Sequence, residues 1–369
     1  MEKNAKIYIP GHRVLVGSTI LRKLREAGCE NLVFRAHQEL DLTVQADVNA
    51  FFNKEQPEYV VLAAAKVGGI LANNTYPAQF IYHNLTIQTH VLNAAWKTGV
   101  KRLLFLGSSC IYPRECPQPM REDYLLTGPL EPTNQPYAVA KIAGVIQCEA
   151  YNREYDTRFL AVMPTNLYGP NDNYDLENSH VIPALIRKFH LAKLAAQGDW
   201  KKIQTDEEKY GWIPGDIKAD LARIACSNGQ DIPPGYTDMK GGNASAGITL
   251  WGSGRPRREF LYVDDLADAC AFLMDLDNHD FSLLCGDRQR FPLPLINIGT
   301  GCDQTVRELA AQVAEIVGYT GDVIWDSTKP DGSPQKLLDV AKLSDLGWKS
   351  STSLIEGLRK TYGRYCGEN

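Results

Sequence analysis

The chain has 369 residues, of which 44% are hydrophobic and 22% are charged, and its formal net charge at pH 7 is −5. This length predicts about two globular domains, and the acidic balance argues against a general binder of nucleic acid or of anionic membranes. The nine cysteines form no C-x-x-C pair and no His/Cys cluster at metal spacing, so neither a disulfide framework nor a metal site is indicated. No apolar run approaches the ~20 residues that cross a bilayer, and no targeting segment is evident, so we expect a cytoplasmic protein whose partners are small molecules or copies of itself.

Strands and helices alternate along the first half of the chain. Apolar runs typical of buried strands are followed by segments with apolar residues at helical spacing. The expected strands lie at 6–11, 31–36, 59–65, 102–109 and 158–169, and the expected helices at 18–28, 45–56, 84–99 and 136–155. Strands that are apolar on both faces belong to parallel sheets covered by helices. We therefore predict an α/β fold, a Rossmann-like doubly wound parallel sheet with a smaller C-terminal α/β substrate domain.

The alternation stops near residue 170. We assign residues 1–170 to the dinucleotide-binding domain, to which some later segments return, and 171–369 mainly to the substrate domain. A helix is expected at 180–196. The polar region at about 197–247, rich in Gly, Pro, Asp and Lys, has no clear period and is interpreted as a mobile insertion. Regular structure is expected again at 248–254, 258–274 and 305–318.

The turn after the first strand has two glycines of a dinucleotide-binding loop. Gly11 and Gly17 stand between a strand and a helix, an arrangement that places a pyrophosphate at the helix N-terminus. The middle position is Val14, where a β-branched side chain weakens binding if the backbone keeps its usual path. A strand-to-helix turn without a ligand is the alternative interpretation.

The residue that ends the second strand indicates the form of the cofactor. An acidic side chain there holds a ribose 2′-hydroxyl, whereas an arginine accommodates a 2′-phosphate. Arg35 occupies this position, and Arg13 lies nearby in the first loop. NADP(H) is therefore favoured, with a solvated strand-end charge as the alternative for Arg35.

A tyrosine and a lysine at helical spacing suggest reductase chemistry. Tyr137 and Lys141 are four residues apart on one face of an expected helix, and Ser108 and Cys110 follow the fourth strand. Open parallel sheets bind their ligands at such strand ends. An ammonium near a phenol lowers its pKa toward neutrality, and Ser108 can share a substrate carbonyl with Tyr137. A Tyr/Lys pair alone is usually an exposed surface pair, but with the glycine turn and the serine it predicts an active site.

Long stretches of the chain resemble the extended short-chain dehydrogenase/reductases and, among them, the GDP-L-fucose synthase family. They are "AAAKVGGILANNTYPAQFIYHNL", "LLFLGSSCIYP", "LEPTNQPYAVAKIAG", "VMPTNLYGPNDNY", "NSHVIPALIRKFH", "REFLYVDDLADA" and "KPDGSPQKLLDV". The resemblance covers most of the chain apart from the polar region. Two departures are Val14, where the family normally has glycine, and an insertion longer than the shortest members require.

The resemblance implies an NADPH-dependent enzyme that converts GDP-4-keto-6-deoxy-D-mannose to GDP-L-fucose by 3,5-epimerisation and 4-keto reduction. Epimerisation beside a ketone needs an acid and a base on opposite faces of the sugar, and the family's pair falls on Cys110 and His180. Ser108 and Tyr137 would hold the enolate. Tyr137, supported by Lys141, would supply the proton for reduction. Without the resemblance, a buried apolar cysteine and a capping or core histidine are the better interpretations.

The resemblance also assigns ligand contacts and an oligomeric state. Cations suit the diphosphate of a GDP-sugar and an aromatic ring suits the guanine. A homodimer paired through helices of the first domain is also implied. The predicted GDP-sugar contacts are Lys188, Trp251, Arg258, Asp331 and Lys336. The predicted cofactor contacts are Gly11, His12, Arg13, Leu15, Val16, Gly17, Arg35, Asp41, Leu42, Leu106, Gly107, Lys141, Pro164, Asn166, Leu167 and His180.

Two other functions stay open from the sequence. One is another nucleotide-sugar epimerase or dehydratase of the same fold, although a simple 4-epimerase has no use for the pair Cys110 and His180. The other is a non-catalytic binding protein whose cofactor loop is impaired by Val14. Loss of NADPH binding would distinguish this last function from the enzymes.

Overall fold

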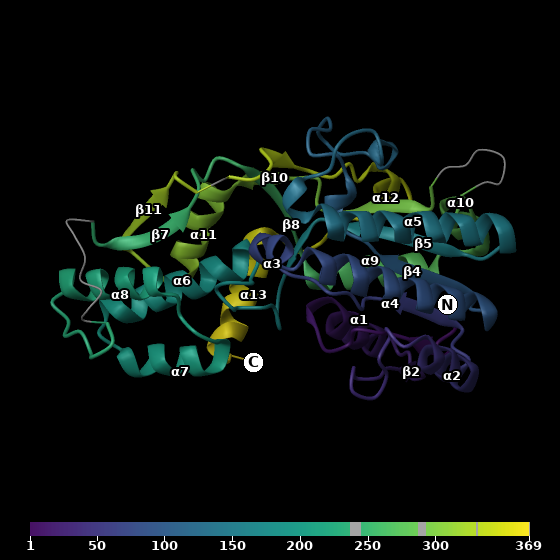
Figure 1. Cartoon of the computed structure of the whole chain (residues 1–369), viewed down its shortest axis with the longest axis horizontal. Helices are drawn as coiled ribbons and strands as arrows, with labels where there is room; N and C mark the ends of the chain where they lie inside the picture. Colours follow the sequence, from purple (N-terminus) through teal and green to yellow (C-terminus); the bar gives the residue numbers. More distant parts are fainter. Residues whose placement is uncertain (237–244, 287–292, 330, 369) are drawn as a thin grey trace. The chain divides into compact units, whose positions relative to one another are not determined.

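The computed structural model describes residues 1–369 apart from 237–244, 287–292, 330 and 369, and the chain forms two compact units (Figure 1). Unit 1 comprises Met1–Asn171, Glu259–Cys302 and Lys336–Thr352. Unit 2 comprises Asp172–Arg258, Asp303–Gln335 and Ser353–Asn369. The chain thus leaves unit 1 after Asn171 and returns to it twice.

Unit 1 is built on a six-stranded parallel sheet with the strand order β2-β1-β3-β4-β5-β9. Its four longest strands are buried at every residue, which explains why their sequences are apolar without alternation. The predicted α/β class with a Rossmann-like parallel sheet is confirmed. The strands are β1 (Ile7–Tyr8), β2 (Leu32–Val33), β3 (Tyr59–Leu62), β4 (Arg102–Leu106), β5 (Phe159–Pro164) and β9 (Leu295–Ile298).

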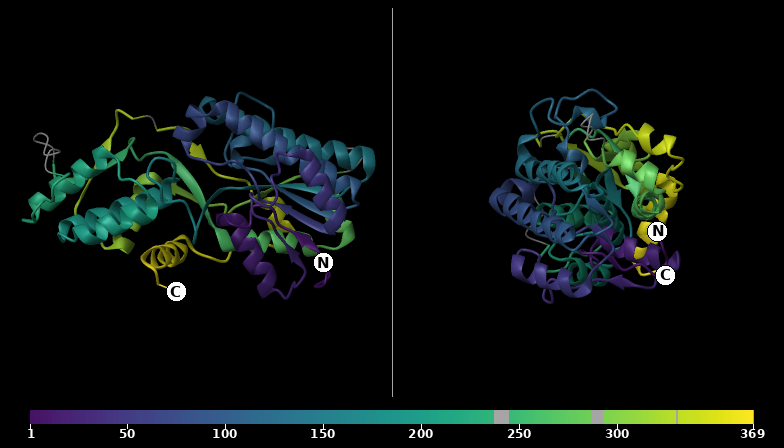
Figure 2. Two further views of the ribbon diagram at one scale, coloured as in Figure 1. Left: turned by 60° about the horizontal axis from the view of Figure 1, so that its bottom comes forward. Right: turned by 90° about the vertical axis from the view of Figure 1, so that its right-hand side faces the viewer.

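Helices cover both faces of this sheet (Figure 2). One apolar cluster joins α2, α4 and α5 to the sheet through residues such as Phe52, Leu92 and Val145, and another joins α1 and α9 to its other face. The helices of unit 1 are α1 (Leu15–Glu26), α2 (Gln45–Glu55), α3 (Ile70–Thr75), α4 (Pro77–Lys97), α5 (Gln135–Tyr155), α9 (Val263–Asp275), α10 (Asn278–Leu284) and α12 (Ala341–Asp345). Short 3-10 helices are η1 (Ser109–Ile111), η2 (Glu122–Tyr124) and η3 (Pro132–Asn134).

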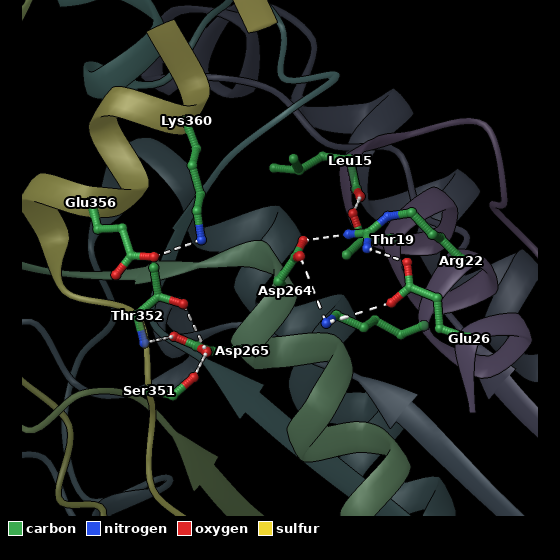
Figure 3. A network of polar contacts seen from close by, with 11 residues as sticks. Leu15, Thr19, Arg22, Glu26, Asp264, Asp265, Ser351, Thr352, Glu356 and Lys360 are labelled. Atoms are coloured by element: carbon green, nitrogen blue, oxygen red, sulfur yellow. Dashed lines mark hydrogen bonds and ion pairs between the residues drawn. The ribbon is translucent and has the colours of Figure 1, made fainter. Parts of the chain in front are cut away.

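Polar contacts lock the first helix of unit 1 against a helix from a later segment (Figure 3). Arg22 of α1 donates to Asp264 of α9 at 2.5 Å, and Lys23 lies 3.8 Å from the same carboxylate. The adjacent Asp265 is buried and accepts hydrogen bonds from Ser351 Oγ, Thr352 N and Thr352 Oγ1 at 2.9–3.1 Å. Helix α1, which begins at the glycine turn, is therefore fixed to α9 by these ion pairs.

The strands outside the main sheet are short. In unit 1, β6 (Asn166–Tyr168) pairs in parallel with the 260–262 part of β8 (Arg257–Tyr262), with Asn166 opposite Phe260. In unit 2, β7 (Gly247–Trp251) pairs in parallel with β11 (Asp322–Asp326). The remaining strands are β10 (Asp303–Thr305) and β12 (Gln335–Lys336). The helices of unit 2 are α6 (Val181–Ala196), α7 (Trp200–Tyr210), α8 (Gly215–Ser227), α11 (Val306–Val317) and α13 (Leu354–Cys366).

The expectation of irregular, mobile chain at about 197–247 is wrong for α7 and α8. The fully buried Arg187 of α6 donates to Asp206 of α7 at 2.7 Å, which fixes α7 to the rest of unit 2. In α8, Ile217, Leu221 and Ile224 are buried at helical spacing, a period that the surrounding charges conceal. Residues 237–244 of the same region lie outside the described residues.

No helix among the described residues is both long and apolar enough to cross a membrane. Within the same residues, no group of three or more His, Cys, Asp or Glu side chains gathers as metal ligands. All nine cysteines are free thiols.

Candidate active site

The turn between β1 and α1 requires glycine at two positions. Gly11 has φ +92°, and a Cβ there would lie 2.8 Å from Ala64 N. A Cβ on Gly17 would lie 2.1 Å from Gly11 O. Val14 differs from both, because its backbone is extended (φ −102°, ψ 168°) and its side chain is 51% exposed. The backbone conformation at position 14 therefore does not require glycine, and any effect of the valine on cofactor binding comes from its side chain.

The other loop residues surround the N-terminus of α1. Leu15 and Val16 begin the helix, so their N–H groups are among those that a helix leaves without internal partners. Arg13 is exposed, and His12 packs on Phe34 with ring centroids 4.7 Å apart. His12 Nδ1 is buried and has no hydrogen-bond partner among the described residues. Two glycines, free amide donors and a cation therefore fit a dinucleotide phosphate.

Arg35 follows β2, as the sequence predicts for a residue near a ribose phosphate. Its guanidinium donates to Glu55 Oε1 at 2.8 Å and to Phe34 O at 2.7 Å, yet the side chain stays 36% exposed. Farther along, Asp41 accepts from Thr43 N and Oγ1, and these bonds hold the pKa of its carboxyl below the usual range. The next residue, Leu42, is buried. Arg35 therefore retains exposed surface for an anion, although Glu55 already compensates part of its charge.

The residues predicted for the reaction gather at the end of β4. Leu106 is the last residue of the strand, and Gly107 has no room for a side chain, because a Cβ would lie 1.9 Å from Met163 Cε. Ser108 Oγ accepts from Cys110 N at 3.4 Å and so caps η1. Lys141 of α5 donates to Leu106 O at 2.7 Å. A strand end, a cap and a helix thus bring Ser108, Cys110 and Lys141 into one region of unit 1.

Tyr137 and Lys141 both lie on α5, and Ser108 lies near Tyr137. The Lys141 ammonium lies 5.8 Å from the centroid of the Tyr137 ring. Burial lowers the pKa of Lys141 to about 8, so the amine is mostly protonated at neutral pH. The structure does not show the predicted lowering of the Tyr137 pKa by Lys141: burial raises that pKa, and the opposing effect comes from Ser108. The phenol is therefore a proton donor at neutral pH.

Cys110 is a buried thiol with cations nearby. Burial raises its pKa, while the hydrogen bond with Ser108 and the charges of Lys336 and Lys141 oppose the rise. Lys336 begins the last segment of unit 1, and this segment bonds to the chain that follows Cys110, because Met120 N donates to Leu337 O at 2.7 Å. The adjacent Leu337 donates its N–H to Gln118 Oε1 at 2.9 Å. Lys336, predicted only as a GDP-sugar contact, therefore belongs to the Cys110 region.

The predicted nicotinamide contacts follow β5. Pro164 ends this strand, and Asn166 and Leu167 begin β6. Asn166 Nδ2 donates to Glu259 O at 2.9 Å, and Thr165 Oγ1 donates to the same oxygen at 3.2 Å. Thr165 and Glu259 are absent from the predicted site. In the sequence, Thr165 lies between the predicted contacts Pro164 and Asn166, and Glu259 follows the predicted contact Arg258. Their position beside predicted site residues is the sequence signal that could have identified them.

His180 occupies the N-cap of α6 in unit 2. The residue as a whole is exposed, yet the protein around its imidazole lowers the pKa, which favours a neutral ring at pH 7. Lys188, two turns further along α6, donates to Thr249 O at 3.2 Å, and burial lowers its pKa. Because His180 and Cys110 belong to different units, their acid–base pairing stays a prediction.

Three predicted GDP-sugar contacts gather around the turn after β7. Trp251 is 57% exposed, and the turn that follows it is held by Asp331, which accepts from Ser253 N and Oγ at 2.7 Å each. The charge of Arg258 lies near the same carboxylate and helps to lower its pKa. Arg258 itself is part-buried and donates to Arg257 O at 2.8 Å. The cation beside the exposed Trp251 ring is Lys329, whose Nζ lies 5.1 Å from the ring centroid, and this pairing suits a nucleotide diphosphate.

Comparison with protein families and with other proteins gives matches over most of the chain. The model of the NAD dependent epimerase/dehydratase family matches residues 7–213 and 227–283. GDP-L-fucose synthase 1 of Arabidopsis thaliana is 49% identical over 99% of this chain and 94% of its own length. GDP-L-fucose synthase of Escherichia coli (strain K12) is 46% identical over 97% of this chain and 95% of its own length.

Solved structures extend the similarity to enzymes of other GDP-sugars. A GDP-6-OMe-4-keto-L-xylo-heptose reductase from C. jejuni superposes with a TM-score of 0.87 at 38% identity, covering 100% of this chain and 99% of that one. A GDP-D-glycero-L-gluco-heptose synthase from Campylobacter jejuni, solved in the presence of NADPH, superposes with a TM-score of 0.84 at 36% identity. That match covers 99% of each chain.

Proposed function

The chain belongs to the NAD-dependent epimerase/dehydratase family, and from this premise we propose that it converts GDP-4-keto-6-deoxy-D-mannose to GDP-L-fucose with NADPH. The reaction would comprise epimerisation at C3 and C5 followed by reduction of the 4-keto group. The observation that carries the proposal is the cluster of Ser108, Cys110, Tyr137 and Lys141 at the end of β4. A thiol beside the reductase residues provides the acid–base group that a simple reductase does not need.

NADP(H) fits the donors of the β1–α1 turn. The N-terminus of α1 would hold the pyrophosphate, and Arg13 and Arg35 would hold the 2′-phosphate. Asp41 and Leu42 would flank the adenine. When bound, the reduced nicotinamide supplies the hydride for the reduction. The residues that would line its pocket are Leu106, Gly107, Pro164, Asn166, Leu167 and His180.

The side chains at the end of β4 would serve both steps. Ser108 and Tyr137 would donate hydrogen bonds to the oxygen on C4, which stabilises the enolate during epimerisation. Cys110 and His180 would move protons at C3 and C5, one removing a proton and the other returning one on the opposite face. Tyr137, protonated at neutral pH, would then give its proton to the C4 oxygen. The Lys141 ammonium would favour the phenolate left behind.

The GDP-sugar contacts predicted from the sequence would each have a separate role. Trp251 would stack on guanine, Lys188 and Arg258 would pair with the diphosphate, and Asp331 would shape the loop that presents them. Lys336, because it lies near Cys110, would contact the sugar end of the substrate. Its ammonium would also favour the thiolate form of Cys110 during proton transfer.

Incubation with GDP-4-keto-6-deoxy-D-mannose in D₂O tests the proposal. With NADPH, we expect loss of the reduced-cofactor absorbance and a product with the L-fuco configuration that carries deuterium at C3 and C5. Without NADPH, deuterium should still enter both positions. Consumption of NADPH without deuterium incorporation would instead identify a reductase that lacks epimerase activity.

A heptose substrate is the second candidate, favoured by the superposition on the C. jejuni heptose reductase at a TM-score of 0.87. The same assay with a GDP-4-keto-heptose decides between the two. A kcat/KM for the heptose above that for the 6-deoxy sugar would transfer the proposal to that substrate class.

The proposal includes a homodimer in the cytoplasm. Tyr82 of α4 and Val139 and Ile146 of α5 are exposed apolar residues on two helices that pack together, which fits a self-complementary surface. The nine free thiols fit a reducing compartment.

Val14→Gly is expected to tighten NADPH binding about tenfold or more. The valine side chain stands exposed at the helix N-terminus, where it would displace the pyrophosphate or the loop, and hydrogen bonds to charged groups contribute ~1.5–3 kcal/mol. Titration of both proteins with NADPH, followed by fluorescence, measures the change. Equal or weaker binding by the glycine variant would show that the loop already accommodates the valine.

Val44→Gly is the matched control for this substitution. Val44 is also an exposed N-cap valine with an extended backbone, at the start of α2. Both variants should show the same change in melting temperature, but only Val14→Gly should change the dissociation constant. Binding of NADPH by the wild-type protein would also exclude the alternative of a non-catalytic protein whose cofactor loop is impaired by Val14.

Arg35→Gln is expected to lower the preference for NADPH over NADH by about tenfold to a hundredfold. The substitution removes the cation predicted at the 2′-phosphate and leaves the contacts shared by both cofactors. Dissociation constants for both cofactors give the ratio. Arg121→Gln is the control, because Arg121, like Arg35, pairs with a carboxylate and lies over an aromatic ring, and it has no predicted ligand role. An unchanged ratio in Arg35→Gln would remove Arg35 from the cofactor site.

A further inference from the structure

Glu259 of β8 is a fully buried carboxylate that the proposed reaction does not use. Its Oε1 accepts hydrogen bonds from Thr300 N at 2.6 Å, Gly301 N at 2.8 Å and Thr300 Oγ1 at 3.3 Å. Its Oε2 accepts from Leu338 N at 2.9 Å. Burial raises the pKa of Glu259, and these backbone donors oppose the rise. The side chain therefore connects the loop after β9 to the segment that contains Leu338.

The backbone carbonyl of the same residue holds a third segment. Thr165 Oγ1 and Asn166 Nδ2 both donate to Glu259 O, at 3.2 and 2.9 Å. Thr165 N also donates to Ile298 O at 3.0 Å, which ties the end of β5 to the end of β9. Asn166 is a predicted nicotinamide contact, so the backbone carbonyl of Glu259 orients the side chain of that contact.

The segment bound by Oε2 leads to the Cys110 region. Leu338 is two residues after Lys336, whose charge acts on Cys110. Leu337 O accepts from Met120 N at 2.7 Å, so this segment also pairs with the chain that follows η1. Glu259 thus connects the predicted nicotinamide contact Asn166 to the predicted substrate contact Lys336.

The local sequence preserves space for this carboxylate. A Cβ on Gly299 would lie 2.3 Å from Glu259 Oε1, so even alanine at 299 would displace the carboxylate. Both carboxylate oxygens face N–H donors. If glutamine replaced Glu259, its side-chain NH₂ group would face one of these backbone N–H donors, and neither could accept a hydrogen bond from the other. Only a carboxylate satisfies every donor around it.

We propose that Glu259 is a positioning residue that holds the Thr165–Asn166 turn and the Lys336–Leu338 segment in one geometry, so that the nicotinamide and the sugar are aligned for C4 reduction. Glu259 touches neither ligand because it is fully buried. Its effect is therefore expected in kcat, which depends on alignment, more than in cofactor affinity, which depends mainly on the β1–α1 turn. The kinetic part of this inference rests on the proposed function.

Glu259→Gln tests the inference, with Asp265→Asn as the matched control. Asp265 is also a buried carboxylate with backbone and hydroxyl donors, but its partners Ser351 and Thr352 are not predicted ligand residues (Figure 3). We expect Glu259→Gln to lower kcat for reduction about tenfold to a hundredfold, since small misplacements of reacting groups have effects of this size. The dissociation constant for NADP⁺ should stay within about threefold. Asp265→Asn should lower only the melting temperature.

Hydrogen exchange of the ligand-free protein measures the geometry without the reaction. In Glu259→Gln, peptides that cover 299–302 and 336–339, whose N–H groups donate to the carboxylate, should exchange faster, whereas those that cover 8–20 should not. Unchanged exchange in both segments, or a loss confined to the melting temperature as in the control, would overturn the inference. If the wild-type protein fails to make GDP-L-fucose, the proposed function fails while the exchange result still tests the role of Glu259.

Gly299→Ala provides an independent variant should Glu259→Gln not fold. The added methyl group acts on the Glu259 carboxylate from the side of the β9 loop. We expect the same lower kcat with nearly unchanged NADP⁺ affinity. Normal kcat and normal exchange in a folded Gly299→Ala protein would contradict the inference.

Discussion

Tyr137→Phe is expected to lower the rate of C4 reduction by about two to four orders of magnitude, the range that general acids contribute. The substitution removes the phenol that would protonate the C4 oxygen, and it leaves Lys141 bonded to Leu106 O. Exchange of the C3 and C5 hydrogens should slow less, because Ser108 still donates to the enolate oxygen. Stopped-flow measurement of cofactor oxidation and NMR measurement of deuterium incorporation follow the two steps separately.

Tyr151→Phe is the control for this change. Tyr151 stands on the same helix and its hydroxyl donates to Asn93 Oδ1 at 3.1 Å, so the variant loses one hydrogen bond away from the site. Both rates should stay near those of the wild type. Reduction by Tyr137→Phe at more than a tenth of the wild-type rate would assign the proton donor to another group.

Cys110→Ser is expected to abolish detectable exchange at C3 and C5 and to leave NADPH binding unchanged. A hydroxyl of nearly the same size fills the buried site, but it is a far weaker acid than a thiol. General acid–base groups contribute about 10²–10⁴-fold, so the exchange rate should fall by that factor. NMR in D₂O without NADPH measures exchange, and titration measures the cofactor.

Cys116→Ser is the matched control, because Cys116 is a partly buried thiol that follows Cys110 in the same connection and has no predicted role. Its exchange rate should equal that of the wild type. Normal exchange by Cys110→Ser would remove the thiol from the mechanism and assign proton transfer at C3 and C5 to another group. Comparison with Tyr137→Phe then shows whether the two steps use different acids within one site.

Local patterns in the sequence determined the type of fold and most of the candidate site. Apolar runs without alternation predicted the buried parallel strands, and Gly11 and Gly17 predicted a turn in which both glycines prove to be sterically required. The four-residue spacing of Tyr137 and Lys141 placed both on one helix face. These features follow from a few neighbouring residues, because periodicity and turn sterics act over short distances along the chain.

Features that depend on distant segments were decided only by the tertiary structure. Residues 259–302 and 336–352 return to unit 1, which places Lys336 near Cys110 and Glu259 behind Asn166. No period in the sequence encodes these contacts, because they form between strand ends that are far apart along the chain. The pKa of Tyr137 depends on burial more than on its neighbour Lys141, and burial is a property of everything packed around a group. Spacing therefore indicated Ser108, Tyr137 and Lys141, and the family resemblance indicated the other candidate residues, whereas long-range packing set their charge states and the contacts that support them.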